Sequence, residues 1–395
     1  MQIPAILMRG GTSKALFFHE NDLPPAGPLR DEFILAAYGG ADPYRRQLDG
    51  VGGATSSTSK VAIIGDGSAH GVDVTYEFGQ VGIDRPIIDR RGNCGNISSA
   101  VGPFAVDEGL VVATDPMTTV RFLNTNTNKV IEAHVPTRNG KFDPTGDFEL
   151  PGVSGTASMI KLDYLDPAGS VTGKLLPSGN PSDELNIPGL GTVRISLVDA
   201  ANPLVFVLWE DLGLTGTELI TDLEGDADLR ARLEKIRAHA SVLAGIADNV
   251  EDATRLAPSV PKLSIVGAPR DYVGSDGTSF SADQTSVRAA MMSMGYPHPS
   301  YPLTGAIATS VAANIPGTIV HEVANLFGDQ VVIGHPSGLL PMIVDIERDG
   351  SEWKVNSVSG QRSARRLMEG SVLVPDERLP MLDPSEHQQV LAEAH

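Results

Sequence analysis

The sequence has little of what marks disulfide-rich or membrane-spanning proteins. Its 395 residues include a single cysteine, so no disulfide can form within the chain, which fits a reducing compartment. No run reaches the roughly 18 apolar residues of a membrane-spanning helix, and the N-terminus shows no basic segment followed by a long apolar stretch. These absences predict a soluble, cytoplasmic protein without membrane contact.

Sequence signatures of bound metals and nucleotides are also missing. The nine histidines are scattered, without the His-x-x-x-His or Cys-x-x-Cys spacing of common metal sites. No Gly-x-Gly-x-x-Gly follows a strand-like run, and Gly-x-Ser-x-Gly, the turn that carries a hydrolase nucleophile, does not occur. We therefore expect neither a metal nor an organic cofactor.

The charge balance is strongly acidic. Asp and Glu number 49 against 30 Lys and Arg, a formal net charge of -19. Such a surface repels phosphate backbones and anionic membranes, so we expect no nucleic-acid partner. An anionic ligand would need a site with local positive potential against this field. Hydrophobic residues at 41% and charged residues at 20% predict a packed globular protein.

Short apolar runs separated by glycine-rich turns predict many strands in the first half of the chain. Strands are expected at residues 3–8, 61–64, 72–78, 119–123 and 129–135. An apolar helix is expected from Ile97 to Glu108. The segment from Leu219 to Ala257, charged and rich in Leu and Ala, is the only long helical region that the pattern indicates.

The length predicts two domains of roughly 200 residues each. A turn-rich stretch at residues 177–183 places their boundary. The first predicted domain then spans residues 1–181 and the second residues 182–385, followed by a polar tail at residues 386–395.

Two segments of the first half recur in the second half in the same order. Residues 59–65 resemble residues 261–267, and residues 93–101 resemble residues 303–311. This alignment matches Lys60 with Lys262 and Cys94 with Thr304. Because two echoes occur in register, we expect a duplicated α/β fold with pseudo-two-fold symmetry and a ligand site between the halves.

Cys94 stands between glycines, directly before the predicted apolar helix. Free amide groups at a helix N-terminus bind anions, and the same field stabilises a thiolate. The loop could therefore supply a carboxylate cradle, through Asn93, Gly95 and Asn96, together with a proton-transfer group. The alternative is a buried, unreactive cysteine, but a cysteine between glycines at a helix start favours function.

Lys60 ends a serine-rich run that includes Ser56 and opens an apolar strand. Desolvation at such a position lowers the pKa of a lysine and makes it a usable base near neutral pH. An ordinary solvated lysine at a strand end is the alternative, and position alone does not separate the two. The matching Lys262 favours the functional interpretation.

Two further polar turns could contact a ligand. Ser13 lies in the turn at residues 9–14, which lacks the glycine spacing of a phosphate-binding loop but could hold a carboxylate. A plain strand-end turn explains that segment equally well. The turn at residues 334–338 contains Ser337 and His335; His335 could donate a proton, although a structural histidine is the better supported interpretation.

Longer motifs are spread over essentially the whole chain. They lie at residues 8–14, 49–60, 92–96, 293–295, 315–318, 334–338 and 362–370. Together these segments resemble the 2-methylaconitate cis–trans isomerase family, which also contains 3-methylitaconate Δ-isomerases and 4-oxalomesaconate tautomerases. The resemblance implies a fold like that of diaminopimelate epimerase, with two similar domains, each a curved sheet around a central helix.

The resemblance also implies which residues act. Lys60 and Cys94 correspond to the acid/base pair of the isomerases. The residues expected to bind substrate are Ser13, Ser56, Asn93, Gly95, Asn96, Lys262, Thr304 and Ser337. The epimerase relatives use one cysteine from each half, but the second-half counterpart here is Thr304. A two-thiol racemase or epimerase is therefore disfavoured.

The predicted function is a cofactor-free isomerase that moves a proton and a double bond in a small unsaturated di- or tricarboxylate. The segment at residues 54–57 favours 2-methylaconitate as the substrate, with 3-methylitaconate and 4-oxalomesaconate as alternatives. A non-catalytic accessory protein that binds polycarboxylates is a further alternative. The sequence leaves a homodimer open, and it does not decide which of Lys60 and Cys94 takes the proton first.

Overall fold

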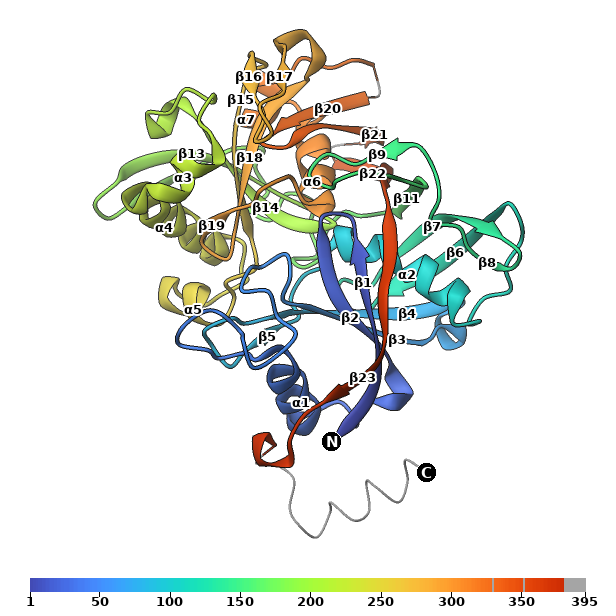
Figure 1. The fold of residues 1–395 in the computed structure, drawn as a ribbon. Helices are drawn as coiled ribbons and strands as arrows, with labels where there is room; N and C mark the ends of the chain where they lie inside the picture. The colour runs from blue at the N-terminus through green and yellow to red at the C-terminus, as the bar shows by residue number, and fades with distance from the viewer. Residues whose placement is uncertain (329, 351, 380–395) are drawn as a thin grey trace.

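Strands dominate the regular structure, as the many short apolar runs predict. The computed structural model describes residues 1–328, 330–350 and 352–379, and nineteen of the strands in these ranges join into one sheet (Figure 1). The first half contributes β1 (Gln2–Gly10), β2 (Ser13–His19), β3 (Lys60–Asp66), β4 (Val74–Val81), β5 (Ile88–Asp89), β6 (Met117–Asn124), β7 (Lys129–Arg138), β8 (Lys141–Phe142) and β11 (Ile160–Leu165). The expected strands correspond to β1, β3, β4, β6 and β7.

The second half supplies the remaining strands of this sheet. They are β12 (Asp183–Ile187), β13 (Gly191–Ala200), β14 (Asn202–Leu208), β15 (Lys262–Gly267), β18 (Val287–Ser293), β19 (Tyr296–Pro297), β20 (Gln330–His335), β21 (Gly338–Asp349), β22 (Glu352–Arg362) and β23 (Ala364–Leu373). Two small hairpins stand apart from it, β9 (Phe148–Glu149) with β10 (Thr156–Ala157), and β16 (Tyr272–Val273) with β17 (Ser279–Phe280).

The pairing order of the strands repeats between the two halves. In the first half, β1–β2 is antiparallel, β2–β3 parallel, β3–β4 antiparallel, β4–β6 parallel and β6–β7 antiparallel. The series β13, β14, β15, β18, β20 and β21 pairs in the same alternation. The predicted duplication of an α/β unit is therefore confirmed.

The two repeats are joined through the sheet itself. Strand β11 pairs with β7 on one side and with β22 on the other. Strand β23 returns from the end of the described chain to pair with β1, and Figure 1 shows these two strands side by side in red and blue. The division at residue 181 stays a prediction, and the predicted tail at residues 386–395 lies outside the described residues.

Each repeat surrounds a helix that is buried on every side. These helices are α2 (Gly95–Asp107) and α6 (Leu303–Ala313), and all residues of α6 and the first twelve of α2 are buried. A helix without a polar face belongs in a core rather than on a surface. Both sequences are rich in Gly, Ala and Ser, whose small side chains let the surrounding strands approach closely. One apolar core contains side chains of both helices.

Other helices cover the outer faces of the sheet. Helix α1 (Pro28–Tyr38) packs on the first repeat and α4 (Ala227–Leu243) on the second. The region expected to form one long helical segment is divided into α3 (Ile220–Gly225), α4 and α5 (Val250–Arg255). Asp226 and Asn249 cause the breaks, because each side chain accepts a backbone N–H and so begins a new helix. A short helix, α7 (Ile319–Val323), follows α6.

No helix within the described ranges combines the length and the apolar character that crossing a bilayer requires.

Candidate active site

The N-termini of the two central helices meet between the repeats. Gly95 begins α2, and a Cβ atom added there would lie 2.8 Å from Leu303 Cβ and 2.9 Å from Thr304 N at the start of α6. A cavity adjoins this junction and is lined from both halves of the chain. Helix N-termini carry free amide groups and positive potential, so the junction favours an anionic ligand.

The lining of the cavity follows the duplication. Ser13 and Asn202 open the equivalent strands β2 and β14, and both line the cavity. Lys60 and Lys262 open β3 and β15 in the same way. Gln80 is the partner of Lys60 in the β3–β4 register, and it too reaches the cavity. Each repeat thus presents a lysine and a polar strand-end residue to one shared space.

Lys60 lies in this cavity near the thiol of Cys94. Its side chain is 7% exposed, its Nζ donates to Gln80 Oε1 over 2.7 Å, and Cys94 lies near enough to influence its pKa. The Gln80 amide is oriented by its own donation to the carbonyls of Ser59 and Ser56. Burial lowers the pKa of Lys60, while the neighbouring Cys94 raises it. A neutral amine in contact with a thiol can exchange protons with it.

Cys94 occupies the N-cap position of α2 and is 7% exposed. Its backbone N–H donates to Asn93 Oδ1 over 2.6 Å, and its carbonyl accepts the N–H of Ser98 over 2.9 Å. The Ser98 hydroxyl donates to the same carbonyl and to Asn93 Oδ1. These bonds fix the loop, so Cys94 lines the cavity from a rigid helix start.

Lys262 is the second amine at the cavity. Its Nζ donates to the carbonyl of Ser259 over 3.1 Å. Burial, followed by the charge of Lys60, lowers the pKa of Lys262 to about 8. Asp89 raises it, and this carboxylate also accepts hydrogen bonds from the backbone and hydroxyl of Ser259. Near neutral pH Lys262 is therefore mostly protonated and positively charged. A modest rise in pH removes that charge.

Asn96 is the second residue of α2 and is held by a buried arginine. Its Oδ1 accepts from Arg362 Nε over 3.1 Å, and its Nδ2 donates to Thr12 Oγ1 over 2.9 Å. Burial lowers the pKa of Arg362 to about 10, whereas Tyr164 and Cys94 raise it. No carboxylate within the described ranges pairs with Arg362 at salt-bridge distance, so this cation adds positive potential behind the site.

Four buried polar atoms at the cavity have no hydrogen-bond partner among the described residues. They are Ser13 Oγ, Asn202 Oδ1, Asn202 Nδ2 and Thr304 Oγ1. A buried polar group without a partner costs about 1–3 kcal/mol. Because the residues that carry these atoms line one cavity beside two lysines, oxygen atoms of a bound acid are the partners that the arrangement fits.

Not every residue expected at the site lines the cavity. Lys60, Cys94, Ser13, Asn93, Asn96, Lys262 and Thr304 do. Gly95 lies at the helix junction instead, Ser56 contributes a carbonyl to Gln80, and Ser337 donates its hydroxyl to the carbonyl of Pro299. Lining residues that the sequence did not indicate are Gln80, Asn202, Ser259, Ser293 and His298. Gln80 had a usable signal, because the β3–β4 hairpin places it opposite Lys60 in register. Asn202 had none, because its structural counterpart Ser13 is a different residue type.

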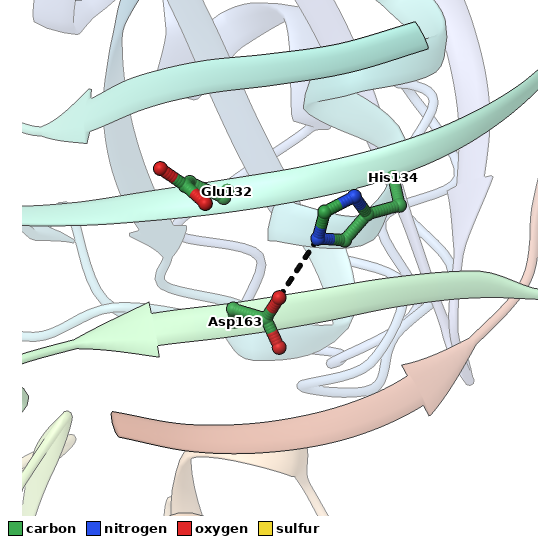
Figure 2. A group of neighbouring side chains, drawn as sticks. All are labelled: Glu132, His134 and Asp163. Atoms are coloured by element: carbon green, nitrogen blue, oxygen red, sulfur yellow. Dashed lines mark hydrogen bonds and ion pairs between the residues drawn. The ribbon is translucent and has the colours of Figure 1, made fainter. Parts of the chain in front are cut away.

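A group that could hold a metal lies elsewhere, on β7 and β11. Figure 2 shows Glu132, His134 and Asp163 converging, with His134 Nε2 2.8 Å from Asp163 Oδ2. Lys161 Nζ lies 2.9 Å from Asp163, and Arg121 Nε lies 3.0 Å from Glu132. Both carboxylates therefore already have cationic partners, and we interpret the group as an ion-pair network of the sheet.

A larger depression also lies away from the lysines, between α1, residues 39–51 and β23. It is open, and none of the unpaired buried polar atoms faces it. We place the site at the smaller cavity because the amines, the thiol and the unpaired polar atoms gather there.

Comparison with known proteins agrees with this geometry. A family model described as PrpF protein matches residues 1–375. The chain belongs to the PrpF protein family. The resemblance inferred from the seven sequence motifs is thereby confirmed.

Relatives of this family member are similar over nearly their whole length. A 3-methylitaconate isomerase of Eubacterium barkeri is 44% identical over 382 residues, covering 96% of this chain and 99% of the relative. A 2-methyl-aconitate isomerase of Shewanella oneidensis is 41% identical over 387 residues, covering 95% and 97%.

Solved structures extend the likeness to the fold. The crystal structure of a methylitaconate Δ-isomerase has a TM-score of 0.78 at 43% identity and covers 97% of this chain and 99% of its own. A hydroxyproline epimerase of Agrobacterium vitis shares the fold alone, with a TM-score of 0.56 at 12% identity and coverage of 97% and 96%. The predicted epimerase-like fold is confirmed.

The helix junction gives a first prediction for this PrpF family member. Gly95→Ala places a methyl group against Leu303 and Thr304, where neither backbone can yield without separating α2 from α6. Overpacking of this kind costs about 1–3 kcal/mol of unfolding free energy. Chemical denaturation should detect that loss, whereas Gly109→Ala, at the far end of α2 where the added Cβ meets open space, tests backbone strain alone. Equal stability of Gly95→Ala and the native protein would contradict the tight junction.

Proposed function

We propose that this protein is a cofactor-free isomerase that moves a proton, and with it a double bond, in a small unsaturated di- or tricarboxylate. The observation that carries the proposal is that Lys60, Cys94 and Lys262 line one cavity, with Cys94 near enough to influence the pKa of Lys60. One group of the pair can remove a proton from carbon and the other can return one. The unpaired polar atoms and the two helix N-termini supply the contacts that carboxylates need.

The chemistry follows from the positions of these groups. Neutral Lys60 removes a proton from the carbon next to the conjugated double bond, and the electron pair of the broken C–H bond shifts into a dienolate. Lys262 and the amide groups at the helix junction stabilise the negative charge that develops on the carboxylate oxygens. The Cys94 thiol then protonates the far end of the allylic system. Proton transfer from the Lys60 ammonium to the neighbouring thiolate restores both groups.

The same steps account for two outcomes. Protonation at a different carbon moves the double bond, whereas rotation in the dienolate before reprotonation exchanges cis and trans forms. The relatives carry both kinds of name, 3-methylitaconate isomerase and 2-methyl-aconitate isomerase. Residues 54–57, which favoured 2-methylaconitate in the sequence, do not line the cavity. We keep 2-methylaconitate as the first substrate to test, with 3-methylitaconate and 4-oxalomesaconate as alternatives.

The experiment is a substrate panel with the purified protein alone. The three acids, with cis-aconitate as a fourth, are incubated in deuterium oxide with a metal chelator present and followed by absorbance and proton NMR. Turnover of one acid, with solvent deuterium entering the product, is expected. Tight binding of an acid without turnover or exchange would instead support the accessory-protein alternative. A cytoplasmic location and a homodimer stay predictions.

Lys262 gives a pH prediction for the native protein. The profile of kcat/KM reports groups of the free protein, so activity should rise as Lys60 loses its proton. Activity should fall again above about pH 8, the pKa that Lys262 has in the cavity. Above that pH Lys262 is neutral and no longer offers a positive charge to the acid. Lys262→Gln should weaken substrate binding by roughly 10- to 100-fold, the effect of losing one hydrogen bond to a charged group.

The control for this variant is Lys14→Gln. Lys14 is an exposed lysine on β2 and does not line the cavity. Its replacement removes the same charge and should leave both limbs of the profile in place. A Lys262→Gln profile that still falls near pH 8 would assign that limb to another group.

A further inference from the structure

Two His-Pro-Ser triplets in the second half fold alike. His298 and His335 are each buried, and in each case the ring Nδ1 accepts the backbone N–H of the serine two residues later, over 3.1 Å and 3.2 Å. The two turns touch, because Ser337 donates its hydroxyl to the carbonyl of Pro299. The repeated geometry shows that these histidines are held in fixed orientations.

Only one of the two rings reaches the cavity. His298 lines it together with Lys60, Cys94 and Lys262, whereas His335 does not. The backbone N–H of His298 donates to the carbonyl of Met291 over 2.7 Å, which ties the turn to β18. The ring therefore sits at the cavity wall on an anchored segment.

The hydrogen bond to Nδ1 decides where the ring proton lies. Burial lowers the pKa of His298 to about 3, with further lowering by Lys60, so the ring is neutral at physiological pH. A neutral imidazole carries one proton, and Nδ1 is occupied as an acceptor. The proton is therefore on Nε2, and among the described residues no acceptor is recorded for it.

We infer that His298 is a substrate-binding residue that donates its Nε2–H to a carboxylate oxygen of the acid, the oxygen on which charge develops in the dienolate. This inference rests on the proposed function. A neutral donor suits this place because Lys60 becomes an ammonium during the reaction. Lys262 is already a cation in this cavity, and a third positive charge would oppose that step, while a neutral N–H stabilises the oxyanion without repelling Lys60.

Two substitutions distinguish the effect of the N–H donor from the effect of the ring's shape. His298→Phe keeps a ring without the N–H, and His298→Gln keeps a neutral amide donor. Loss of one donor to an oxyanion lowers kcat by about 100-fold or more, so the Phe variant should lose that much and the Gln variant distinctly less. Both should retain the two limbs of the native pH profile. Equal activity of the two variants would overturn the inference.

The matched control is His335→Gln. It changes the equivalent histidine of the other His-Pro-Ser triplet, which does not line the cavity, and should leave kcat/KM near the native value. The tautomer is read independently in the free protein, from the ring ¹⁵N resonances of histidine-labelled samples, with the His298→Gln spectrum assigning the signal. A protonated Nδ1 would overturn the inference whether or not the Phe variant folds.

Failure of the proposed function has its own signature. If the native protein converts none of the four acids, that function fails, and the inference is tested by calorimetric titration with trans-aconitate. Binding should then weaken at least tenfold in His298→Phe, a loss of about 1.4 kcal/mol, and little in His298→Gln. Equal affinities in the two variants, or no binding to the native protein, would overturn it.

Discussion

Replacing Lys60 with methionine should abolish turnover, with kcat falling by about 10³- to 10⁴-fold. Methionine keeps the length and apolar stem of the side chain but removes the amine that donates to Gln80 and lies near Cys94. Without a base near the reacting carbon, the C–H bond should stay intact. The measurement is loss of substrate signal together with uptake of solvent deuterium, and both should fall together.

Stability serves as the control for this variant. Lys60 is a buried amine whose ionised form burial disfavours, so an apolar replacement should fold at least as stably as the native chain. The unfolding free energy from chemical denaturation should not decrease. Inactivity of a destabilised Lys60→Met protein would therefore leave no support for a catalytic role.

Lys60→Arg distinguishes a base from a fixed positive charge. A guanidinium stays protonated at every accessible pH and cannot accept a proton. If Lys60 served only to hold a carboxylate, arginine would restore much of the activity. We expect Lys60→Arg to be as inactive as Lys60→Met, and substantial turnover by the arginine variant would sink the assignment of the base.

The parts of the site that the sequence predicted are those that local order determines. Lys60 opens an apolar strand and Cys94 precedes an apolar helix. The flanking residues are enough to predict both positions. The duplication then brought in Lys262 and Thr304. The fold was partly predictable for the same reason, since the apolar runs and glycine turns indicate β1, β3, β4, β6 and β7 of the first half.

The parts that the sequence missed depend on tertiary placement. His298 reaches the cavity because the short strand β19 turns the chain back against β18. A two-residue strand is too short to produce a periodic pattern from which the turn could be predicted. Asn202 was hidden because its counterpart Ser13 is a different residue type. Ser56 was misplaced by its nearness to Lys60 in sequence: the backbone there presents a carbonyl to Gln80, and the side chain does not line the cavity.

In Cys94→Ala, turnover should fall while exchange of substrate hydrogen with solvent continues. In Lys60→Met, by contrast, both should fall together. The thiol is the group that we assign to reprotonation, and Lys60 remains in place to remove the first proton. Turnover should fall by about 10²- to 10³-fold, a loss within the range for one acid/base group. Exchange of the substrate's own proton with solvent should persist, because Lys60 can take that proton and return a deuteron to the same carbon.

The comparison with Cys94→Ser tests whether acidity or size matters. A serine hydroxyl preserves the hydrogen-bonding shape near Lys60, but it is a far weaker acid than a thiol and should rescue little turnover. Because Cys94 is the only cysteine in the chain, either substitution leaves a protein without thiols. Residual turnover should then resist thiol-alkylating reagents that inactivate the native protein.

Deuterium exchange in the two variants should also depend on whether the reaction starts from the substrate or from the product. In the reverse direction Cys94 would face the carbon that loses a proton, as the thiolate that forms when the neighbouring Lys60 takes the thiol proton. Lys60→Met should then block exchange from either side, because the thiol has no base to take its proton and the thiolate does not form. Cys94→Ala should block exchange only when the reaction starts from the product. Exchange lost equally from both sides in Cys94→Ala would mean that Lys60 acts only through the thiol, and the order of the two proton transfers would have to be reversed.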